Sequence, residues 1–258
     1  MKINLKITGI LFLLLLSVFI LYLSINIEDK QILRINKIEI TGGTLYPDAE
    51  YARFAMLTDT VNYQFLSPAI IKDRIEKHPY VEKAFVTTEG VGGISVVVKE
   101  KKFTAMLVDS TKQILLTEKM QLIPVMPHSV DLNFPVISNA DGGNKIKLFE
   151  SAKGNRDVVT AFKILEVFRM TGEELADNLS QIDLRNGKDI LVYFSNINFP
   201  VVFGRNDEIK KALYFNNLWK FMKGNEINNY LDYVDLRFDK HVFLGVTEKN
   251  SGNEEQKI

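Results

Sequence analysis

The sequence predicts an α+β protein with a single N-terminal transmembrane helix, a small unit of order strand–helix–helix–strand–strand, and a larger, mostly antiparallel β unit with two or three helices. Three observations support this. An apolar run near the start carries no charge, and over residues 35–101 the spacing of hydrophobic residues changes between that of a strand and that of a helix. After residue 102, stretches that alternate between apolar and polar residues are separated by turn signals. The expected divisions are a cytoplasmic N-terminus (1–6), a transmembrane helix (7–27), a linker (28–34), two units (35–101 and 102–246) and a disordered polar tail (247–258).

Composition narrows the function classes. Lys plus Arg total 32 and Asp plus Glu total 32, so no net charge would attract nucleic acid to the molecule as a whole. The chain has no cysteine, which excludes disulfides, thiolate nucleophiles and Cys-ligated metals. We therefore expect no nucleic-acid partner.

Residues 7–27 read ITGILFLLLLSVFILYLSINI and carry no charge. As a helix they would span roughly 31 Å, about the hydrocarbon thickness of a bilayer. A cleaved signal peptide is the alternative, but the run ends without an A-x-A-like site, which favours a retained anchor. Lys2 and Lys6 precede the run and Glu28 and Asp29 follow it, so the N-terminus is expected in the cytoplasm and the bulk of the chain in the periplasm or outside the cell.

In the first unit, the hydrophobic residues are spaced as in strands in some stretches and as in helices in others. The run INKIEIT at 35–41 alternates as a strand, and 47–57 and the segment after Ser67-Pro68 follow helical spacing, the second helix stopping at His78-Pro79. Residues 81–88 and 94–101 again alternate, on either side of a glycine-rich turn.

The second unit is richer in strands. Asp157 is expected to cap a helix at 158–170, Asn186-Gly187 is a hairpin turn, and a second helix is expected at about 207–222. The expected strands are 103–108, 113–116, 181–185, 189–194, 200–203 and the two arms of a closing hairpin, 233–238 and 241–246.

Two stretches of this unit echo each other: QIDLRNGKDILVY at 181–193 and YVDLRFDKHVFLG at 233–245. A glycosidase could use Asp183 and Asp235 as paired carboxylates. A simpler interpretation pairs Asp183 with Arg185 and Asp235 with Arg237 as partly exposed ion pairs. No catalytic or nucleotide-binding motif is present, and His78, His128 and His241 lack metal-ligand spacing. We therefore expect no enzyme, no cofactor, no metal and no small-molecule substrate.

Binding is the remaining function class. Val234, Leu236 and Phe238 share one face of the first arm of the closing hairpin, which predicts a core face. The second arm, HVFLGV, is apolar on both faces and ends just before the tail. It is either an exposed sheet edge, to which a partner can add a strand, or a buried central strand; the sequence leaves both open.

Five stretches resemble the FtsQ/DivIB family of bacterial cell-division proteins. They are IEITG at 38–42, HPYVEKAFV at 78–86, ISVVVKEKKFTA at 94–105, VVFGRND at 201–207 and YVDLRF at 233–238. The resemblance implies a POTRA domain at 35–101 followed by an FtsQ-type β domain.

The resemblance also implies a function. It suggests a non-enzymatic scaffold of the divisome, anchored in the inner membrane at the septum, that binds FtsB/FtsL-like bitopic proteins by strand addition and other divisome proteins through the POTRA domain. The implied partner-binding residues are Phe238, Lys240, His241, Val242, Phe243 and Leu244. One alternative is a POTRA-bearing envelope chaperone or transport component. Another, which agrees less well with the sequence motifs, is an envelope hydrolase.

Overall fold

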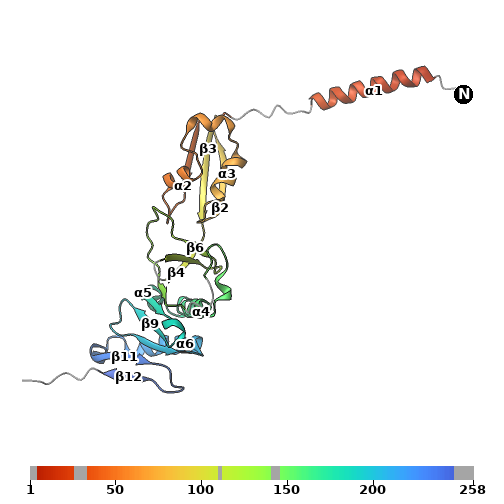
Figure 1. The fold of residues 1–258 in the computed structure, drawn as a ribbon. Helices are drawn as coiled ribbons and strands as arrows, with labels where there is room; N and C mark the ends of the chain where they lie inside the picture. The colour runs from red at the N-terminus through yellow and green to blue at the C-terminus, as the bar shows by residue number, and fades with distance from the viewer. Residues whose placement is uncertain (1–4, 26–33, 110–111, 141–145, 247–258) are drawn as a thin grey trace, which may run out of the picture.

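The computed structural model describes residues 5–25, 34–109, 112–140 and 146–246. Helix α1 covers Leu5–Ile25, followed by two folded units (Figure 1). The last two residues of the predicted span 7–27, most of the predicted linker and the whole predicted tail 247–258 lie outside the described residues. Across the described ranges, no helix is both long enough and apolar enough to cross a membrane.

The first unit has the predicted order strand, helix, helix, strand, strand. Its three-stranded sheet has the order β1-β3-β2, with β1 parallel and β2 antiparallel to β3. The elements are β1 (Lys37–Thr41), α2 (Asp48–Phe54), the 3₁₀ turn η1 (Thr60–Phe65), α3 (Pro68–Glu76), β2 (Val81–Glu89) and β3 (Gly93–Glu100).

Local chemistry sets the ends of these elements. The Ser67 hydroxyl accepts a hydrogen bond from the N–H of Ile70, and Pro68 occupies the first helical position, so α3 begins there. At the end of β3, the Glu100 carboxylate accepts hydrogen bonds from the Tyr51 hydroxyl and the N–H of Leu45, which ties the loop after β1 to the sheet.

The second unit is built on a mixed sheet of nine strands in the order β12-β11-β10-β9-β8-β7-β4-β5-β6. Five of its eight strand pairs are antiparallel. The strands are β4 (Phe103–Asp109), β5 (Lys112–Thr117), β6 (Leu122–Pro124), β7 (Val136–Ser138), β8 (Leu179–Asp183), β9 (Ile190–Phe194), β10 (Val201–Gly204), β11 (Leu231–Asp235) and β12 (Phe243–Val246).

Helices α4 (Arg156–Thr171), α5 (Glu173–Asn178) and α6 (Glu208–Met222) complete this unit, with 3₁₀ turns η2 (Ala152–Gly154), η3 (Arg185–Gly187) and η4 (Glu226–Tyr230). The predicted cap of α4 was wrong: Asn155 accepts hydrogen bonds from the N–H groups of Asp157 and Val158, so α4 begins earlier than expected. Buried side chains from α4, α6 and the sheet form the main core, which includes Phe168, Phe215 and Trp219.

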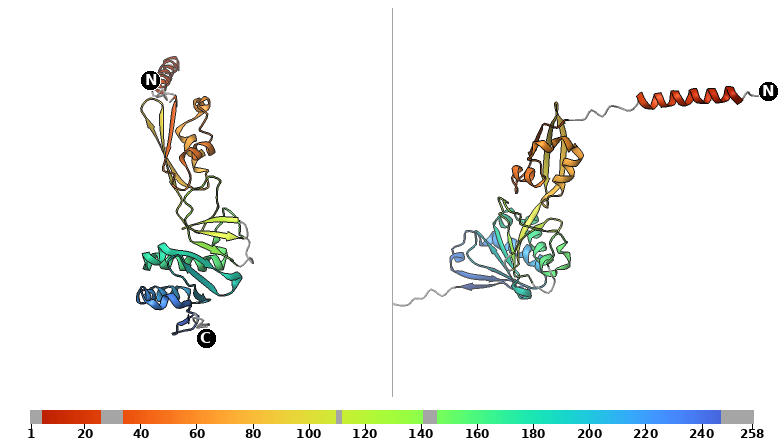
Figure 2. Two further views of the ribbon diagram at one scale, coloured as in Figure 1. Left: turned by 90° about the vertical axis from the view of Figure 1, so that its left-hand side faces the viewer. Right: turned by 45° about the horizontal axis from the view of Figure 1, so that its top comes forward.

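The two units share a second core cluster. Met106, Leu115 and Ile123 of the second unit pack in the same buried cluster as the interior of the first. The Tyr80 hydroxyl also accepts a hydrogen bond from the N–H of Met126, and the N–H of Val130 donates to the Leu45 carbonyl. The chain thus crosses back to the first unit after β6, and both further views show the units joined end to end (Figure 2).

Candidate functional site

Strand β12 lies at one end of the sheet order and pairs antiparallel with β11. On its other side, no strand of the described part of the chain pairs with it. The other end of the sheet is different, because Leu122 of β6 donates a backbone hydrogen bond to Glu150 and accepts one from Phe149. Of the two possibilities that the sequence left open for the closing arm, the described fold corresponds to the edge strand.

The register identifies the backbone groups that face outward. The N–H groups of Val234 and Leu236 donate to the carbonyls of Pro200 and Val202, at 3.1 and 2.8 Å, and therefore point toward β10. Because successive N–H groups of a strand alternate in direction, those of Tyr233 and Asp235 point toward β12.

In an antiparallel pair, residues that face each other share the same hydrogen-bonding direction. Gly245 and Phe243 face Tyr233 and Asp235, so their N–H groups point inward, toward β11. The N–H groups of Leu244 and Val246 then point outward, where an added strand would receive them.

Two aromatic side chains meet at the start of this edge. The rings of Phe238 and Phe243 lie 4.7 Å apart in a T-shaped arrangement, and the two residues are 52% and 51% exposed. The prediction that Phe238 lies on the core face was wrong. Strand β11 ends at Asp235 and a loop begins after it, so the alternation that keeps Val234 buried no longer applies at Phe238.

Arg237 holds this loop in place. Its guanidinium donates to the Asp235 carboxylate at 2.7 Å and to Asp189, beside β9, at 2.8 Å. Burial alone would raise the pKa of Asp235, but the hydrogen bonds and charge of Arg237, helped by Lys211, lower it overall. Asp235 is therefore a buried carboxylate that stays ionised because Arg237 pairs with it.

Two glycines allow the close contacts around the hairpin. Gly204 has a φ of +64°. A Cβ there would lie 2.7 Å from Cγ of Arg237, because the aliphatic part of the Arg237 side chain packs against this glycine. A Cβ on Gly245 would meet the Tyr233 ring at 2.3 Å. Side chains larger than hydrogen at either position would displace the residues that shape the edge.

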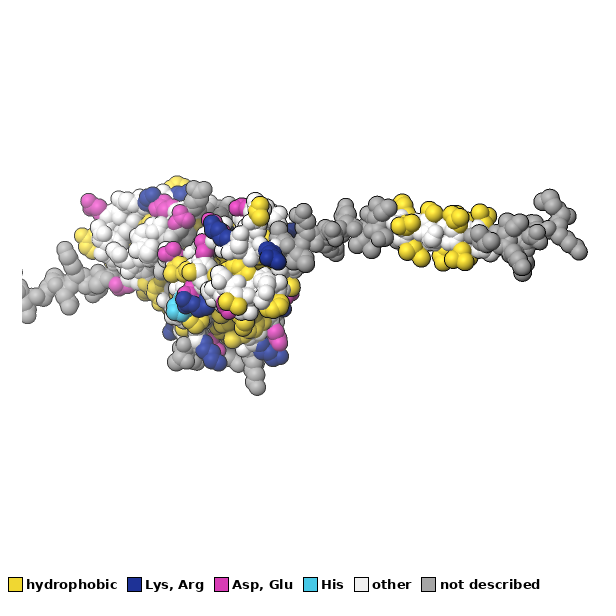
Figure 3. All heavy atoms as spheres, turned by 90° about the horizontal axis from the view of Figure 1, so that it is seen from above, with side chains coloured by type: hydrophobic (Ala, Val, Ile, Leu, Met, Phe, Trp, Pro, Cys, Tyr) yellow, Lys and Arg dark blue, Asp and Glu magenta, His cyan; other side chains and the backbone are white. Residues whose placement is uncertain are grey.

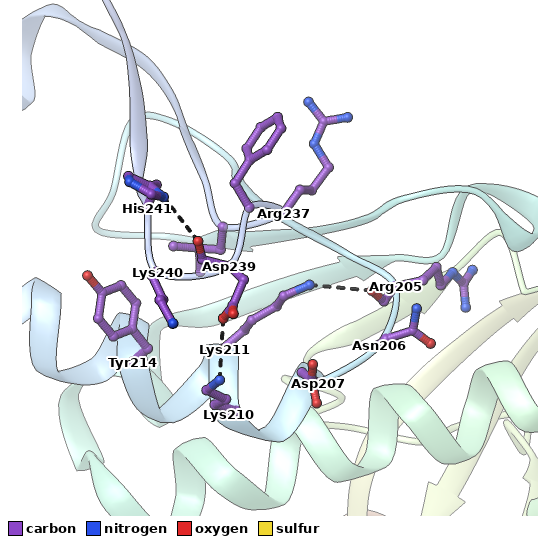
Figure 4. A pocket seen from close by; sticks show the side chains of 12 residues that line it. Arg205, Asn206, Asp207, Lys210, Lys211, Tyr214, Arg237, Asp239, Lys240 and His241 are labelled. Carbon is purple, nitrogen blue, oxygen red and sulfur yellow. Dashed lines mark hydrogen bonds and ion pairs between the residues drawn. The ribbon is translucent and has the colours of Figure 1, made fainter.

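A cavity of 470 Å³ opens beside the aromatic pair (Figure 4). It is bounded by the loop after β10, one side of α6 and the loop between β11 and β12; the lining residues are Arg205, Asn206, Asp207, Lys210, Lys211, Tyr214, Leu236, Arg237, Phe238, Asp239, Lys240 and His241. Lys210 pairs with Asp239 at 3.5 Å, and Lys211 donates to the Phe203 carbonyl at 2.8 Å. The cavity is therefore basic and partly aromatic, with Lys210 held by the Asp239 carboxylate and Lys211 by backbone carbonyls.

The sequence echo does not produce two equal sites. The Asp183 carboxylate accepts hydrogen bonds from the Arg185 backbone N–H and the Asn139 side chain, and no ion pair among the described residues joins it to the Arg185 guanidinium. The ion pair predicted there is wrong, whereas the pair predicted between Asp235 and Arg237 is present. Strands β9 and β10 separate the two aspartates, so they are about 14 Å apart, too far for the carboxylate pair of a glycosidase.

The partner-binding residues predicted from the sequence fall into three groups. Phe238, Lys240 and His241 line the cavity, while Phe243 and Leu244 lie on β12. Val242 packs against the main core. The sequence did not identify four further lining residues: Arg205, Lys210, Lys211 and Tyr214. Gly204-Arg205 belongs to the motif VVFGRND, which was a possible signal for this part of the cavity. In the described ranges, no group of three or more His, Asp or Glu side chains is placed to hold a metal ion.

The fold and site together define a class: a mixed α+β protein whose larger sheet ends on an exposed strand beside a basic, aromatic cavity. Over 77 residues the chain is 31% identical to the cell division protein FtsQ of Rhodothermus marinus. The matched segment is 30% of this chain and 28% of that protein, so the likeness spans less than a third of the relative's length. No protein-family model matches the chain.

Proposed function

We propose that this chain is a non-enzymatic scaffold of the bacterial division machinery, anchored in the inner membrane by residues 7–27, that binds a bitopic partner of the FtsB/FtsL kind. The 77-residue likeness to a cell division protein supports the proposed role in cell division. The single observation that supports the mechanism is β12, an edge strand whose outward N–H groups are available for strand addition.

Two adjoining features would add selectivity to such binding. An added strand would lie beside Leu244, which is 40% exposed, and would pass the Phe238–Phe243 pair. Aromatic anchors beside a strand edge supply contact area, and main-chain hydrogen bonds supply register. The basic cavity next to them would then contact side chains of the partner that carry opposite charge.

The proposed topology follows from the sequence. A run of 21 uncharged residues preceded by Lys6 and followed by Glu28 supports an anchor with a short cytoplasmic N-terminus. The two units would then lie in the periplasm, and the first of them would be available to other division proteins.

A pair of substitutions at Leu244 tests strand addition directly. Leu244→Pro removes an outward N–H but no hydrogen bond to β11, whereas Leu244→Ala keeps the N–H and removes the side chain. We expect co-purification with the FtsB/FtsL-like partner to be lost in Leu244→Pro and only weakened in Leu244→Ala. Equal binding by both variants and the wild type would refute strand addition at this edge.

Localisation in the cell tests the proposed role in cell division independently of strand addition at β12. A fluorescent fusion of the full chain should concentrate at midcell in dividing cells. Even distribution around the envelope would argue against a division scaffold and favour the alternative of an envelope chaperone or transport component, which would also use a strand edge.

A further inference from the structure

The end of the first unit that faces away from the second unit carries exposed apolar side chains on separate loops. Val91, at the tip of the β2–β3 turn, is 97% exposed, and Val61 and Phe65 of η1 are 72% and 71% exposed. Ile70, in the first turn of α3, adds a partly exposed side chain next to η1. In the described part of the chain none of these is covered by another element, and the site at β12 makes no use of them.

The chain direction places these loops at one end. Strand β2 begins beside the second unit, where the N–H of Lys101 donates to the Tyr80 carbonyl, and runs away from it to Glu89. Helix α3 runs the opposite way, because its last turn meets the start of β2, where the N–H of Ala84 donates to Glu76. The start of α3, and η1 before it, therefore lie toward the same end as the β2–β3 turn.

The chain coming from α1 enters at this same end. The side-chain amide of Asn36 donates to the Val91 carbonyl at 3.1 Å, and the N–H of Asn36 donates to the Gly92 carbonyl at 2.8 Å. Seen from above, this end of the molecule shows hydrophobic side chains together with charged ones (Figure 3). We call Val61, Phe65 and Val91 the end face.

The distance to the end of α1 is limited by covalent geometry. Nine peptide steps separate Ile25 from Arg34, so the two cannot be more than roughly 32 Å apart. If residues 7–27 lie in a bilayer, Arg34 is held within about that distance of its surface, and the turn at Val91, which Asn36 contacts, lies next to it. Three side chains alone would bind lipid weakly, but the anchor makes the contact intramolecular, and such tethering strengthens weak contacts without adding new ones.

We propose that the end face rests on the lipid bilayer, with Val61, Phe65 and Val91 at the level of the headgroups. This inference depends on the proposed anchoring by residues 7–27 and goes beyond it by assigning a lipid-binding role to the first unit. Apolar and aromatic side chains on loop tips favour the interfacial region of a membrane. Asp59, which caps η1 through the N–H of Val61, and Glu89 lie beside these loops and offset the nearby Arg34 and Lys37. Lys37 is itself paired with Glu39, so the attraction is apolar and not to lipid charge.

Single-cysteine labelling tests the contact on the full chain, because the natural sequence contains no cysteine. Val61→Cys, Phe65→Cys and Val91→Cys are labelled with a fluorophore and reconstituted in phosphatidylcholine vesicles whose lipids carry acyl-chain nitroxide quenchers. We expect quenching at all three positions and none at Val97→Cys, on the open face of the sheet of the same unit. Quenching at the end face no stronger than at position 97 would overturn the inference.

Two further measurements separate the possible causes of failure. A label at Phe19→Cys in α1 reports anchoring: if it is not quenched, the anchoring proposal fails, and if it alone is quenched, only the end-face inference fails. Phe65→Asp should reduce quenching of the label at position 91, whereas Phe85→Asp, the same change on the open sheet face, should not. Contact that arises only with phosphatidylglycerol vesicles would refute the apolar mechanism.

Discussion

Arg237 should be the most stabilising charged side chain of the closing hairpin. Its guanidinium makes hydrogen bonds to Asp235, which is 3% exposed, and to Asp189. Removing one partner of a hydrogen-bonded charge typically costs about 1.5–3 kcal/mol, and more where the remaining charge is buried. Because the Arg237 side chain is itself 44% exposed, water compensates in part, and we expect Arg237→Ala to lower the free energy of unfolding by about 2 kcal/mol.

The measurement is urea unfolding of the full chain in a mild detergent, followed by the fluorescence of Trp219, the single tryptophan, which is buried in the core of the second unit. Arg169→Ala is the matched control, because Arg169 pairs with Glu166 on the exposed side of α4; it should change stability by less than about 0.5 kcal/mol.

Adding Asp235→Asn to Arg237→Ala should recover about 1 kcal/mol, since the buried charge is removed. Equal effects of Arg237→Ala and Arg169→Ala would refute the reasoning. So would a double variant less stable than Arg237→Ala alone.

The remaining predictions concern an ion pair between the two units, formed by Glu82 and Lys119, a glycine and a buried histidine. The pKa of the Glu82 carboxyl is lowered to about 2 by hydrogen bonds from Lys119 and Lys99, so carboxyl NMR should show titration near pH 2, and Lys119→Ala should raise that value; titration near pH 4 in the wild type would contradict the contact. Gly204→Ala should destabilise the second unit by about 1–2 kcal/mol through its positive φ, whereas Gly154→Ala, which meets open space, should be nearly neutral in the same urea assay. Burial lowers the pKa of His78 to about 4, so the neutral ring stabilises the fold above pH 6.5, and this contribution should be lost as pH falls from 6.5 to 4; a ring that titrates near 6.5 by NMR would refute it.

Much of the first unit could be predicted because its signals are local. The Ser67 hydroxyl caps α3 and the Pro68 ring fits its first helical position, so these two residues determine where the helix begins. The alternation of apolar and polar residues in 81–88 and 94–101 predicts the two long strands that pair as β2 and β3. None of these requires knowledge of distant residues. The order β1-β3-β2, with β1 inserted parallel to β3, does require it, because no turn links those two strands directly.

The cavity could not be predicted in the same way. Its walls come from the loop after β10, from α6 and from the loop after β11, which meet only because β10 and β11 are parallel neighbours. A parallel pair brings the carboxyl ends of both strands to one edge of the sheet, so the loops that follow them face each other. Lys210 and Tyr214 showed only helical spacing in the sequence and gave no sign of a cavity. The loop after β11 was also predicted too short, which placed Phe238 in the core instead of at the surface.

The repeated Asp-Leu-Arg sequence shows why local identity is a weak guide to a site. In the first copy, Arg185 lies in a tight turn with a φ of +48°, and its backbone N–H, not its guanidinium, contacts Asp183. In the second copy the chain continues as an open loop, and Gly204 on the neighbouring strand leaves space for the Arg237 stem. The guanidinium can therefore turn back to Asp235 and across to Asp189. The same three residues lead into the turn of a hairpin in the first copy and hold the loop before an edge strand in the second, because the chain turns at Arg185 but continues as an open loop beside Gly204 at Arg237.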